Sequence, residues 1–306
     1  PPFVFARRVV YRPRMHRVAL TALLSLSLAA ALTAQPQVSP YTAPVTLYAS
    51  VTDKAGAFVR GLSAADFTLK EDGKDRVIHE AAVDDLPATV ILLIDTSGSM
   101  TEQVERLNSW LKVFLNRLHP ADRLRVGRVD GKGVFSPASF STNRREAAAI
   151  ISAWGPGVPQ TPLWDSLRSS VDVLAAEPGY RAVVVLSDGE DTTSKLTSSD
   201  VTRAAQTLRV AVHALETPRT QSPVTGMQSN YRKDDLQNVV RNTGGLHRRV
   251  PKVEDGQAID DVSRAVRERY RITFSTGAPT GKLHEIELRA KTKDLTVRVA
   301  GKYGAQ

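Results

Sequence analysis

The middle of the chain alternates two hydrophobic patterns. Residues 90–94 (VILLI) and 182–186 (AVVVL) are unbroken apolar runs rich in branched side chains, which is typical of strands buried on both faces. Residues 102–118 instead place apolar side chains at helical spacing. Because the two patterns alternate from residue 88 to about 250, we expect a doubly wound, mostly parallel sheet with helices on both faces, a Rossmann-like α/β fold.

Other elements of this region carry boundary signals. Pro120 closes the first helix, Pro162 stands at the first turn of a later one, and Gly244 follows the end of another. The further expected helices cover residues 144–154, 163–176, 199–208, 234–241 and 259–268, and the further strands cover residues 124–129, 210–215 and 246–250.

The segments on either side of this region have the two-residue period of half-buried strands. Residues 45–51 alternate before it, and residues 270–274 alternate after it. Neither flank is long enough to form a robust core alone. We therefore expect residues 45–83 and 269–306 to pair into one small β-sandwich-like domain around the α/β domain.

Asp72-Gly73 is a strong turn signal in the first flank. It lies between two strand-like runs, residues 67–70 and 77–79. Because more than two residues separate these runs, we expect a hairpin with a wide loop.

The amino-terminal residues are typical of a targeting segment. Met15-His16-Arg17 precedes an apolar run over residues 18–32, and Ala34 is a small residue suited to cleavage. We expect a secretory signal peptide over residues 1–34, with 1–14 an upstream extension and the mature chain starting near Gln35. An uncleaved membrane anchor is the alternative, although the run is short for a span.

These segments give an expected domain organisation and location. The expected parts are a signal peptide with its extension (1–34), a β segment (35–86), the α/β domain (87–268) and a second β segment (269–306). We expect a chain with such a leader to be exported to the periplasm, the cell surface or the medium, and to meet a membrane only through the leader if this stays uncleaved.

The net charge of +9 does not indicate a nucleic-acid partner. Five arginines and no acidic residue lie in residues 1–34, so the rest of the chain has 36 basic and 32 acidic residues. That balance is too mild for a nucleic-acid-binding surface. The absence of cysteine excludes disulfides, thiol catalysis and cysteine-ligated metal.

Polar residues follow the first buried strand directly. Asp95, Ser97 and Ser99 offer oxygen ligands, and Gly98 lets the loop fold them toward one point. Ligands of open α/β sheets collect beyond the carboxyl ends of the strands. A small set of hard oxygen ligands suits Mg²⁺, which keeps part of its water shell.

The Asp95-x-Ser97-x-Ser99 pattern resembles the metal-ion-dependent adhesion site (MIDAS) of von Willebrand factor type A domains. In that family a threonine from a later loop and an aspartate after a later buried strand complete the site. Thr161 and Asp188 match these two positions in order. The resemblance implies a site made of Asp95, Ser97, Ser99, Thr161 and Asp188 that holds Mg²⁺, with Mn²⁺ or Ca²⁺ as alternatives.

The flanks also resemble those of bacterial exported proteins described as related to von Willebrand A domains. The markers are residues 65–67 (ADF) with 71–73 (EDG), and residues 301–304 (GKYG) near the other end. With the flanks included, the resemblance covers most of residues 42–304.

Signs of enzyme chemistry are weaker. Phosphatases with an aspartyl nucleophile need a second carboxylate two positions on, where this chain has Ser97. Glu190 and Asp191 could serve as a base, but we interpret both as solvated loop acids. Residues 277–282 (GAPTGK) have one residue too few for a phosphate-binding loop.

Two further features lie near the expected site. The polar loop at residues 217–230 should emerge on the same sheet edge as Asp95, as a flexible connection or as part of the site. Trp164 is assigned to the core rather than to the rim.

The sequence thus predicts an exported, metal-dependent protein-binding module for adhesion or scaffolding, and not an enzyme. In the family, a carboxylate from the partner fills the open position on the ion, so the expected partner is a protein that presents an Asp or Glu. The alternatives are a metal-dependent hydrolase and a structural envelope protein with a vestigial metal site.

Overall fold

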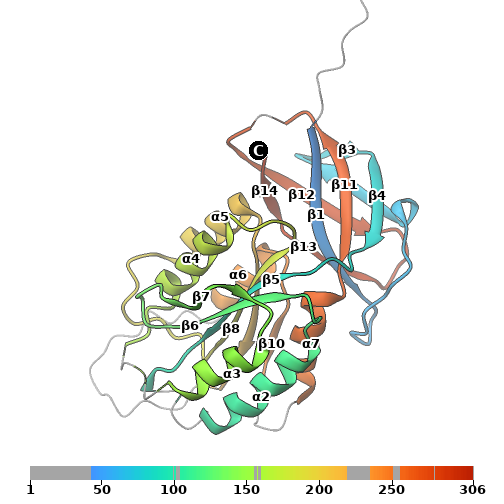
Figure 1. Ribbon diagram of the computed structural model, residues 1–306. Helices are drawn as coiled ribbons and strands as arrows, with labels where there is room; N and C mark the ends of the chain where they lie inside the picture. Colours follow the sequence, from blue (N-terminus) through green and yellow to red (C-terminus); the bar gives the residue numbers. More distant parts are fainter. Residues whose placement is uncertain are drawn as a thin grey trace, which may run out of the picture. The chain divides into compact units, whose positions relative to one another are not determined.

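The computed structural model describes residues 43–98, 100, 104–154, 157, 160–218, 235–250, 256–278 and 280–305, with only the backbone described for 104–109 (Figure 1). Ala43–Gln306 form one compact unit. The expected signal segment, Ser99 and residues 219–230 of the long polar loop lie outside the described residues. No helix in the described ranges is long and apolar enough to cross a membrane.

A six-stranded sheet in the order β10-β9-β8-β5-β6-β7 forms the centre of the α/β part. All neighbouring strands run parallel except the edge strand β7, which is antiparallel to β6. This sheet confirms the predicted fold class. The strands are β5 (Thr89–Ile94), β6 (Arg123–Arg128), β7 (Phe135–Ser141), β8 (Arg181–Ser187), β9 (Ala211–Glu216) and β10 (His247–Arg249).

Helices cover both faces of this sheet (Figure 1). On β5, Leu92 and Ile94 pack toward one group of helices, while Ile91 and Leu93 pack toward the other, which explains the unbroken apolar run. The first group is α2 (Val104–Arg117), α3 (Arg144–Ser152) and α7 (Gly256–Arg267), and the second is α4 (Leu163–Leu174), α5 (Ser198–Leu208) and α6 (Asp235–Asn242).

The two flanking segments pair with each other in two four-stranded sheets. One has the order β13-β1-β11-β4 and the other β14-β12-β2-β3. Val45 of β1 pairs with Phe274 of β11, and Leu69 of β2 pairs with Leu288 of β12, so each sheet joins strands from both flanks. The strands are β1 (Ala43–Thr52), β2 (Phe67–Glu71), β3 (Lys74–Arg76), β4 (Ile78–Val83), β11 (Tyr270–Thr276), β12 (Leu283–Ala290), β13 (Thr296–Val299) and β14 (Lys302–Gly304); a 3-10 turn, η1 (Ala64–Asp66), precedes β2.

The wide loop expected at Asp72-Gly73 is wrong. Glu71 pairs directly with Lys74, so only two residues connect β2 and β3. Both turn residues have positive φ, 49° and 75°, which is the backbone of the tightest hairpin turns. The run expected to be the partner strand instead begins at Ile78, as β4, and joins the other sheet beside β11.

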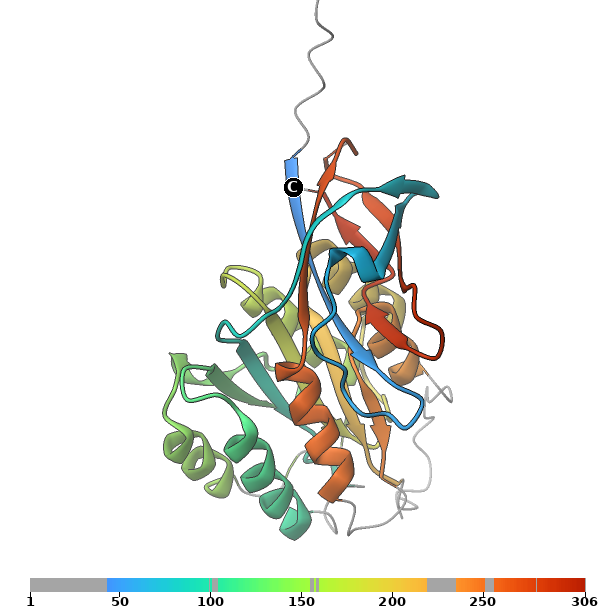
Figure 2. The same cartoon turned by 90° about the vertical axis from the view of Figure 1, so that its right-hand side faces the viewer.

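Arg269 forms contacts at the junction of the β-sandwich and the α/β part. Helix α7 runs into β11, with β1 alongside (Figure 2), and Arg269 directly precedes β11 in the chain. Its guanidinium is buried, forms a 2.7 Å ion pair with Asp84 and lies 4.3 Å from the ring centre of Tyr180. It also donates to the main-chain oxygens of Val266 and Leu86. A buried guanidinium needs this full set of acceptors, because any unpaired donor there costs stability.

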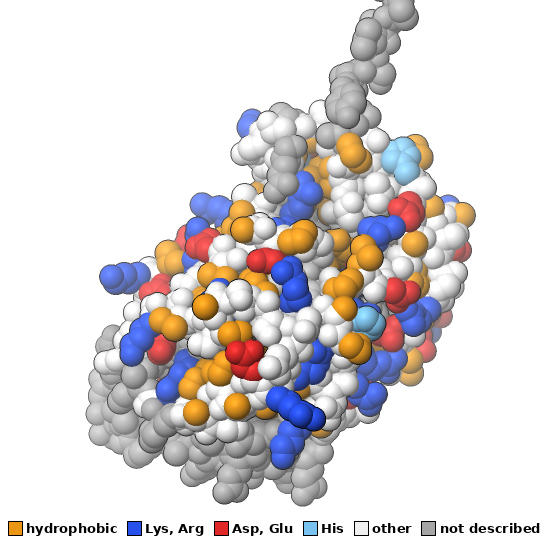
Figure 3. Space-filling model, viewed as in Figure 1, with side chains coloured by type: hydrophobic (Ala, Val, Ile, Leu, Met, Phe, Trp, Pro, Cys, Tyr) orange, Lys and Arg blue, Asp and Glu red, His pale blue; other side chains and the backbone are white. Residues whose placement is uncertain are grey.

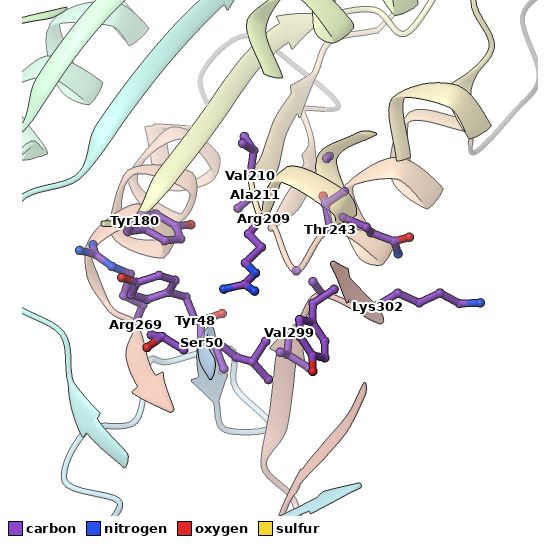
Figure 4. Close-up of a pocket in the computed structure, with 18 of the residues that line it drawn as sticks. Tyr48, Ser50, Tyr180, Arg209, Val210, Ala211, Thr243, Arg269, Val299 and Lys302 are labelled. Atoms are coloured by element: carbon purple, nitrogen blue, oxygen red, sulfur yellow. The ribbon is translucent and has the colours of Figure 1, made fainter. Parts of the chain in front are cut away.

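A small cavity lies at this junction (Figure 4). Tyr48, Tyr180 and Arg269 gather on one side of it, and Arg209 points into it from another. Its free space is about 50 Å³. By this measure a water molecule needs roughly 10–15 Å³, so the cavity suits a few waters and not a metabolite.

His213 on β9 is a buried polar group beside the same junction. Its Nδ1 accepts a 3.1 Å hydrogen bond from the Leu246 N–H, so Nε2 carries the proton and lies 2.8 Å from the Tyr180 hydroxyl. Burial, and then the charge of Arg269, lower the pKa of His213 to about 3. The folded chain therefore holds this imidazole neutral.

The buried imidazole makes stability depend on pH. Between the unfolded pKa of 6.5 and the folded pKa of about 3, only the unfolded state takes up the proton. The free energy of unfolding should therefore fall below pH 6.5, by roughly 3 kcal/mol at pH 4 from this group. Urea denaturation at pH 6.5 and at pH 4 measures this change. Between these two values the free energy of unfolding should fall less for His213→Gln than for the parent. The exposed His119→Gln is the control, and equal slopes for His213→Gln and the parent would contradict the assignment.

Candidate functional site

The candidate site lies where two neighbouring strands of the central sheet end. Strands β5 and β8 are adjacent and parallel, with Ile94 paired to Leu186. The Asp95 N–H extends the pairing with a 2.8 Å bond to the Leu186 oxygen. Asp95 and Asp188 therefore follow the ends of two neighbouring strands, and their exposed fractions are 0% and 1%.

Hydrogen bonds hold the Asp95 carboxylate in place. One oxygen accepts the Ser97 N–H at 2.9 Å, and the other accepts the Ser187 hydroxyl at 2.7 Å. Ser187 in turn accepts the Gly189 N–H at 3.0 Å through the same hydroxyl. Ser187, which the sequence analysis missed, thus links the two strand ends. The only signal for it was a hydroxyl directly before Asp188.

The electrostatics of Asp95 reflect its burial and a second acid. Burial, and then the negative charge of Asp188, raise the pKa of Asp95 to about 6, although hydrogen bonds from Ser97 and Ser187 oppose the shift. Two buried carboxylates repel each other when both are ionised, and a bound cation would offset this repulsion.

The turn after β8 fixes Asp188. One Asp188 oxygen accepts the Glu190 N–H at 3.0 Å, and Gly189 has a φ of 77°, a conformation that favours glycine. The chain then passes beside Thr161. The Thr161 N–H donates to the Thr192 hydroxyl at 2.8 Å, and the Thr192 N–H donates to the Thr161 oxygen at 2.9 Å. The loop with Thr161 and the loop with Asp188 are therefore joined directly.

Asp191 is not the solvated loop acid that we expected. It is 2% exposed and accepts the Leu163 N–H at 2.9 Å, at the start of α4. Ser194 accepts the next two amide hydrogens, from Trp164 and Asp165, at 3.0 and 3.1 Å. The unpaired N–H groups of a helix start need such acceptors. The loop after Asp188 thus caps the helix that follows Thr161. Trp164 itself is buried, as predicted.

A close backbone contact and an arginine border the loop after β5. An added Cβ at Gly157 would lie 1.6 Å from the Thr96 oxygen, so only glycine fits there. Arg128, at the end of β6, donates from Nε to the Thr96 hydroxyl at 3.0 Å and covers the Trp154 ring. The sequence analysis missed Arg128, whose position at a strand end was the only available signal.

The structure brings Asp95, Ser97 and Asp188 to one sheet edge and ties Thr161 to the loop that follows Asp188. Thr161 and Ser97 are buried, each 2% exposed. Among the described residues, no group of three or more His, Asp or Glu side chains could hold a metal. A metal at this edge would therefore be held by two carboxylates completed by hydroxyls. That set of hard oxygen ligands fits Mg²⁺ and leaves room for further ligands.

Comparison with solved structures gives distant similarities. An aerotolerance-related membrane protein from Bacteroides fragilis, with multiple mutations to serines, is 14% identical, with 58% of this chain and 98% of that chain covered and a TM-score of 0.48. A von Willebrand factor type A protein from Catenulispora acidiphila is 12% identical, with 88% and 74% covered and a TM-score of 0.47. The pilus adhesin SpaC from Lactobacillus rhamnosus GG is 10% identical, with 78% and 47% covered and a TM-score of 0.45.

Comparison with families gives a decisive result. No curated protein sequence matches the chain. The family model of the von Willebrand factor type A domain matches residues 88–246, a little over half of the chain. The matched region starts directly before β5 and includes the loops that carry Asp95, Thr161 and Asp188. The chain therefore belongs to the von Willebrand factor type A domain family.

Proposed function

We propose that this chain is a divalent-metal-dependent protein-binding module for adhesion or scaffolding. Domains of its family are in general interaction modules rather than enzymes. The observation that carries the proposal is the pair of buried acids, Asp95 and Asp188, at adjacent strand ends. We assign Asp95, Ser97, Ser99, Thr161 and Asp188 as the residues that would hold Mg²⁺, with Mn²⁺ or Ca²⁺ as alternatives.

The raised pKa of Asp95 supports a cation at this edge. Burial and the charge of Asp188 disfavour the ionised carboxylate, and a divalent ion would offset both effects. The hydrogen bonds from Ser97 and Ser187 hold the carboxylate in one orientation before any ion arrives. Such preorganisation lowers the entropic cost of binding.

A carboxylate of the partner is the proposed bridge between the two proteins. Mg²⁺ takes six ligands, and the protein groups here leave at least one position open. An anionic oxygen fits that position by charge and hardness, whereas a neutral or basic side chain gains little from it. The proposed partner is therefore a protein that presents an Asp or Glu at its surface.

Asp191 bears on the hydrolase alternative. It was one of two candidate bases, and its carboxylate accepts the amide hydrogens that open α4. A carboxylate that is 2% exposed and holds a helix start is poorly placed to reach a substrate proton. No contact in the described residues favours hydrolysis over binding.

Removal of Asp95 should abolish metal binding. Asp95→Ala deletes one of the two carboxylates, and the fold should persist because the substitution also removes a crowded buried charge. Calorimetric titration with Mg²⁺ and Mn²⁺ should give heat of binding for the parent and none for the variant. Asp75→Ala, an equal charge change on the exposed strand β3, is the control. Equal metal affinity of parent and Asp95→Ala would contradict the assigned site.

Partner capture should depend on the ion. Chelator should release proteins captured from an envelope extract, and added Mg²⁺ should restore them. Thr161→Ala should weaken capture by altering the ligands of the ion, whereas Lys195→Ala, farther along the loop after Asp188, should change it little. If capture survives both the chelator and the Asp95→Ala substitution, coordination of the ion is the wrong mechanism. An ordinary surface interface would then explain binding.

We also propose that the chain is exported. The observation is the charged and apolar segment over residues 15–32, followed by Ala34. Amino-terminal sequencing of protein recovered from the periplasm, cell surface or medium should give a start at or near Gln35. A full-length protein confined to the cytoplasm would overturn this proposal.

A further inference from the structure

A groove separates the edges of two sheets on the β10 side of the unit. Strand β10 is the last strand of the six-stranded sheet, and β13 is the last strand of one sandwich sheet. Helix α6 contributes the third wall. The groove has a volume of about 450 Å³. Ligand-binding clefts measure roughly 300–1,000 Å³. The assigned metal ligands that the structure describes, Asp95, Ser97, Thr161 and Asp188, do not line it.

Its lining carries positive charge. Arg241, His247, Arg248 and Arg298 line the groove, and among the described residues no Asp or Glu does. The face of the molecule shown in Figure 3 is different, because basic and acidic side chains alternate across it. A concave surface of one charge sign attracts ligands of the other sign.

The basic residues differ in how far their charge is compensated. Arg248 pairs with Asp261 at 2.8 Å, and His247 pairs with Glu216 at 2.7 Å. The charge of Arg248 is thus balanced by an acid outside the groove, and the His247 ring is held by another.

The remaining two arginines bond neutral groups. Arg298 donates to the Thr52 hydroxyl at 3.0 Å, and Arg241 donates to the Asn238 side-chain oxygen at 2.7 Å. Within the described parts of the chain, neither forms an ion pair. Burial and then the charge of Arg248 lower the pKa of Arg298, although the charge of Asp261 opposes the shift. A ligand carboxylate beside Arg298 would offset the repulsion from Arg248.

The groove is closed at one end by direct backbone contact. Thr243 and Ala300 form an isolated β-bridge, and the Gly301 N–H donates to the Asn242 oxygen at 3.1 Å. An added Cβ at Gly244 would lie 2.6 Å from the Ala300 nitrogen. These contacts fix the sandwich against the α/β sheet, so the walls are in place before a ligand binds.

We propose that this groove binds an acidic, extended peptide segment of a protein partner, with carboxylates paired to Arg241 and Arg298. The planar guanidinium matches a carboxylate in two hydrogen bonds. The groove is larger than a simple anion requires, and Val297, which is partly exposed, offers apolar contact to the stem of an acidic side chain. The edge strands β10 and β13 present main-chain groups to which an extended peptide bonds. The proposal does not depend on the metal site.

The test is fluorescence anisotropy with a labelled hexaglutamate peptide, on the full chain in the presence of chelator. The parent should bind this peptide more tightly than hexaglutamine or hexalysine. Arg241→Gln and Arg298→Gln should each weaken binding roughly tenfold. Arg145→Gln is the matched control, because its side chain is exposed on α3, which packs by β6 and β7 at the opposite edge of the sheet.

Each further outcome decides the proposal. Arg241 is exposed, so its variant should keep the fold, which circular dichroism checks even if Arg298→Gln is unstable. Unchanged affinity in Arg241→Gln, or an equal loss in Arg145→Gln, would overturn the site. Tighter binding of inorganic phosphate than of hexaglutamate would overturn the peptide assignment. Asp95→Ala should bind hexaglutamate as the parent does, so failure of the metal proposal and failure of this one are separable.

Discussion

The register of two neighbouring parallel strands is the constraint on which the candidate site depends. Because β5 and β8 are adjacent and in register, the acids that follow them reach the same edge of the sheet. Both strands are buried on both faces, and the two acids that follow them are buried as well rather than exposed in a solvated turn. Burial and mutual repulsion then raise the pKa of Asp95. The burial of two neighbouring acids destabilises the metal-free chain. The same burial is the source of the cation affinity that we propose.

A second constraint joins the sandwich to the α/β part. Each sandwich sheet combines strands of both flanks, and the chain returns from α7 into β11, which pairs with both β1 and β4. Arg269 stands at that return, with its charge balanced by Asp84 and its donors satisfied by nearby carbonyl oxygens. A cavity that suits a few water molecules lies at this junction, and a basic groove lies beside β10 and β13. The metal site that we propose lies at the ends of β5 and β8, whereas the basic groove lies beside β10 and β13, so the two proposals concern different surfaces.

Local patterns predicted the fold where a single physical effect dominated. Apolar runs marked β5 and β8 because both faces are buried, and helical periodicity marked the covering helices. The errors arose where tertiary partners decided the outcome. The Asp72-Gly73 turn is tight because β4 leaves for the other sheet, which the spacing of apolar residues does not reveal. Asp191 has the composition of a loop acid, and only the approach of α4 makes it a buried cap.

The sequence by itself determined the order of strands and helices, the family motif and the oxygen-rich ends at Asp95 and Asp188, because burial patterns and residue chemistry are local properties. Tertiary structure decided which groups meet. Three pairs show this: Ser187 bonds Asp95, Thr192 bonds Thr161, and Arg241 lines the same groove as Arg298. The members of each pair are distant in the chain or lie on different elements. Such pairs depend on strand order and on the angle at which elements pack. No one-dimensional pattern records these, since many partners are chemically equivalent until the chain has folded.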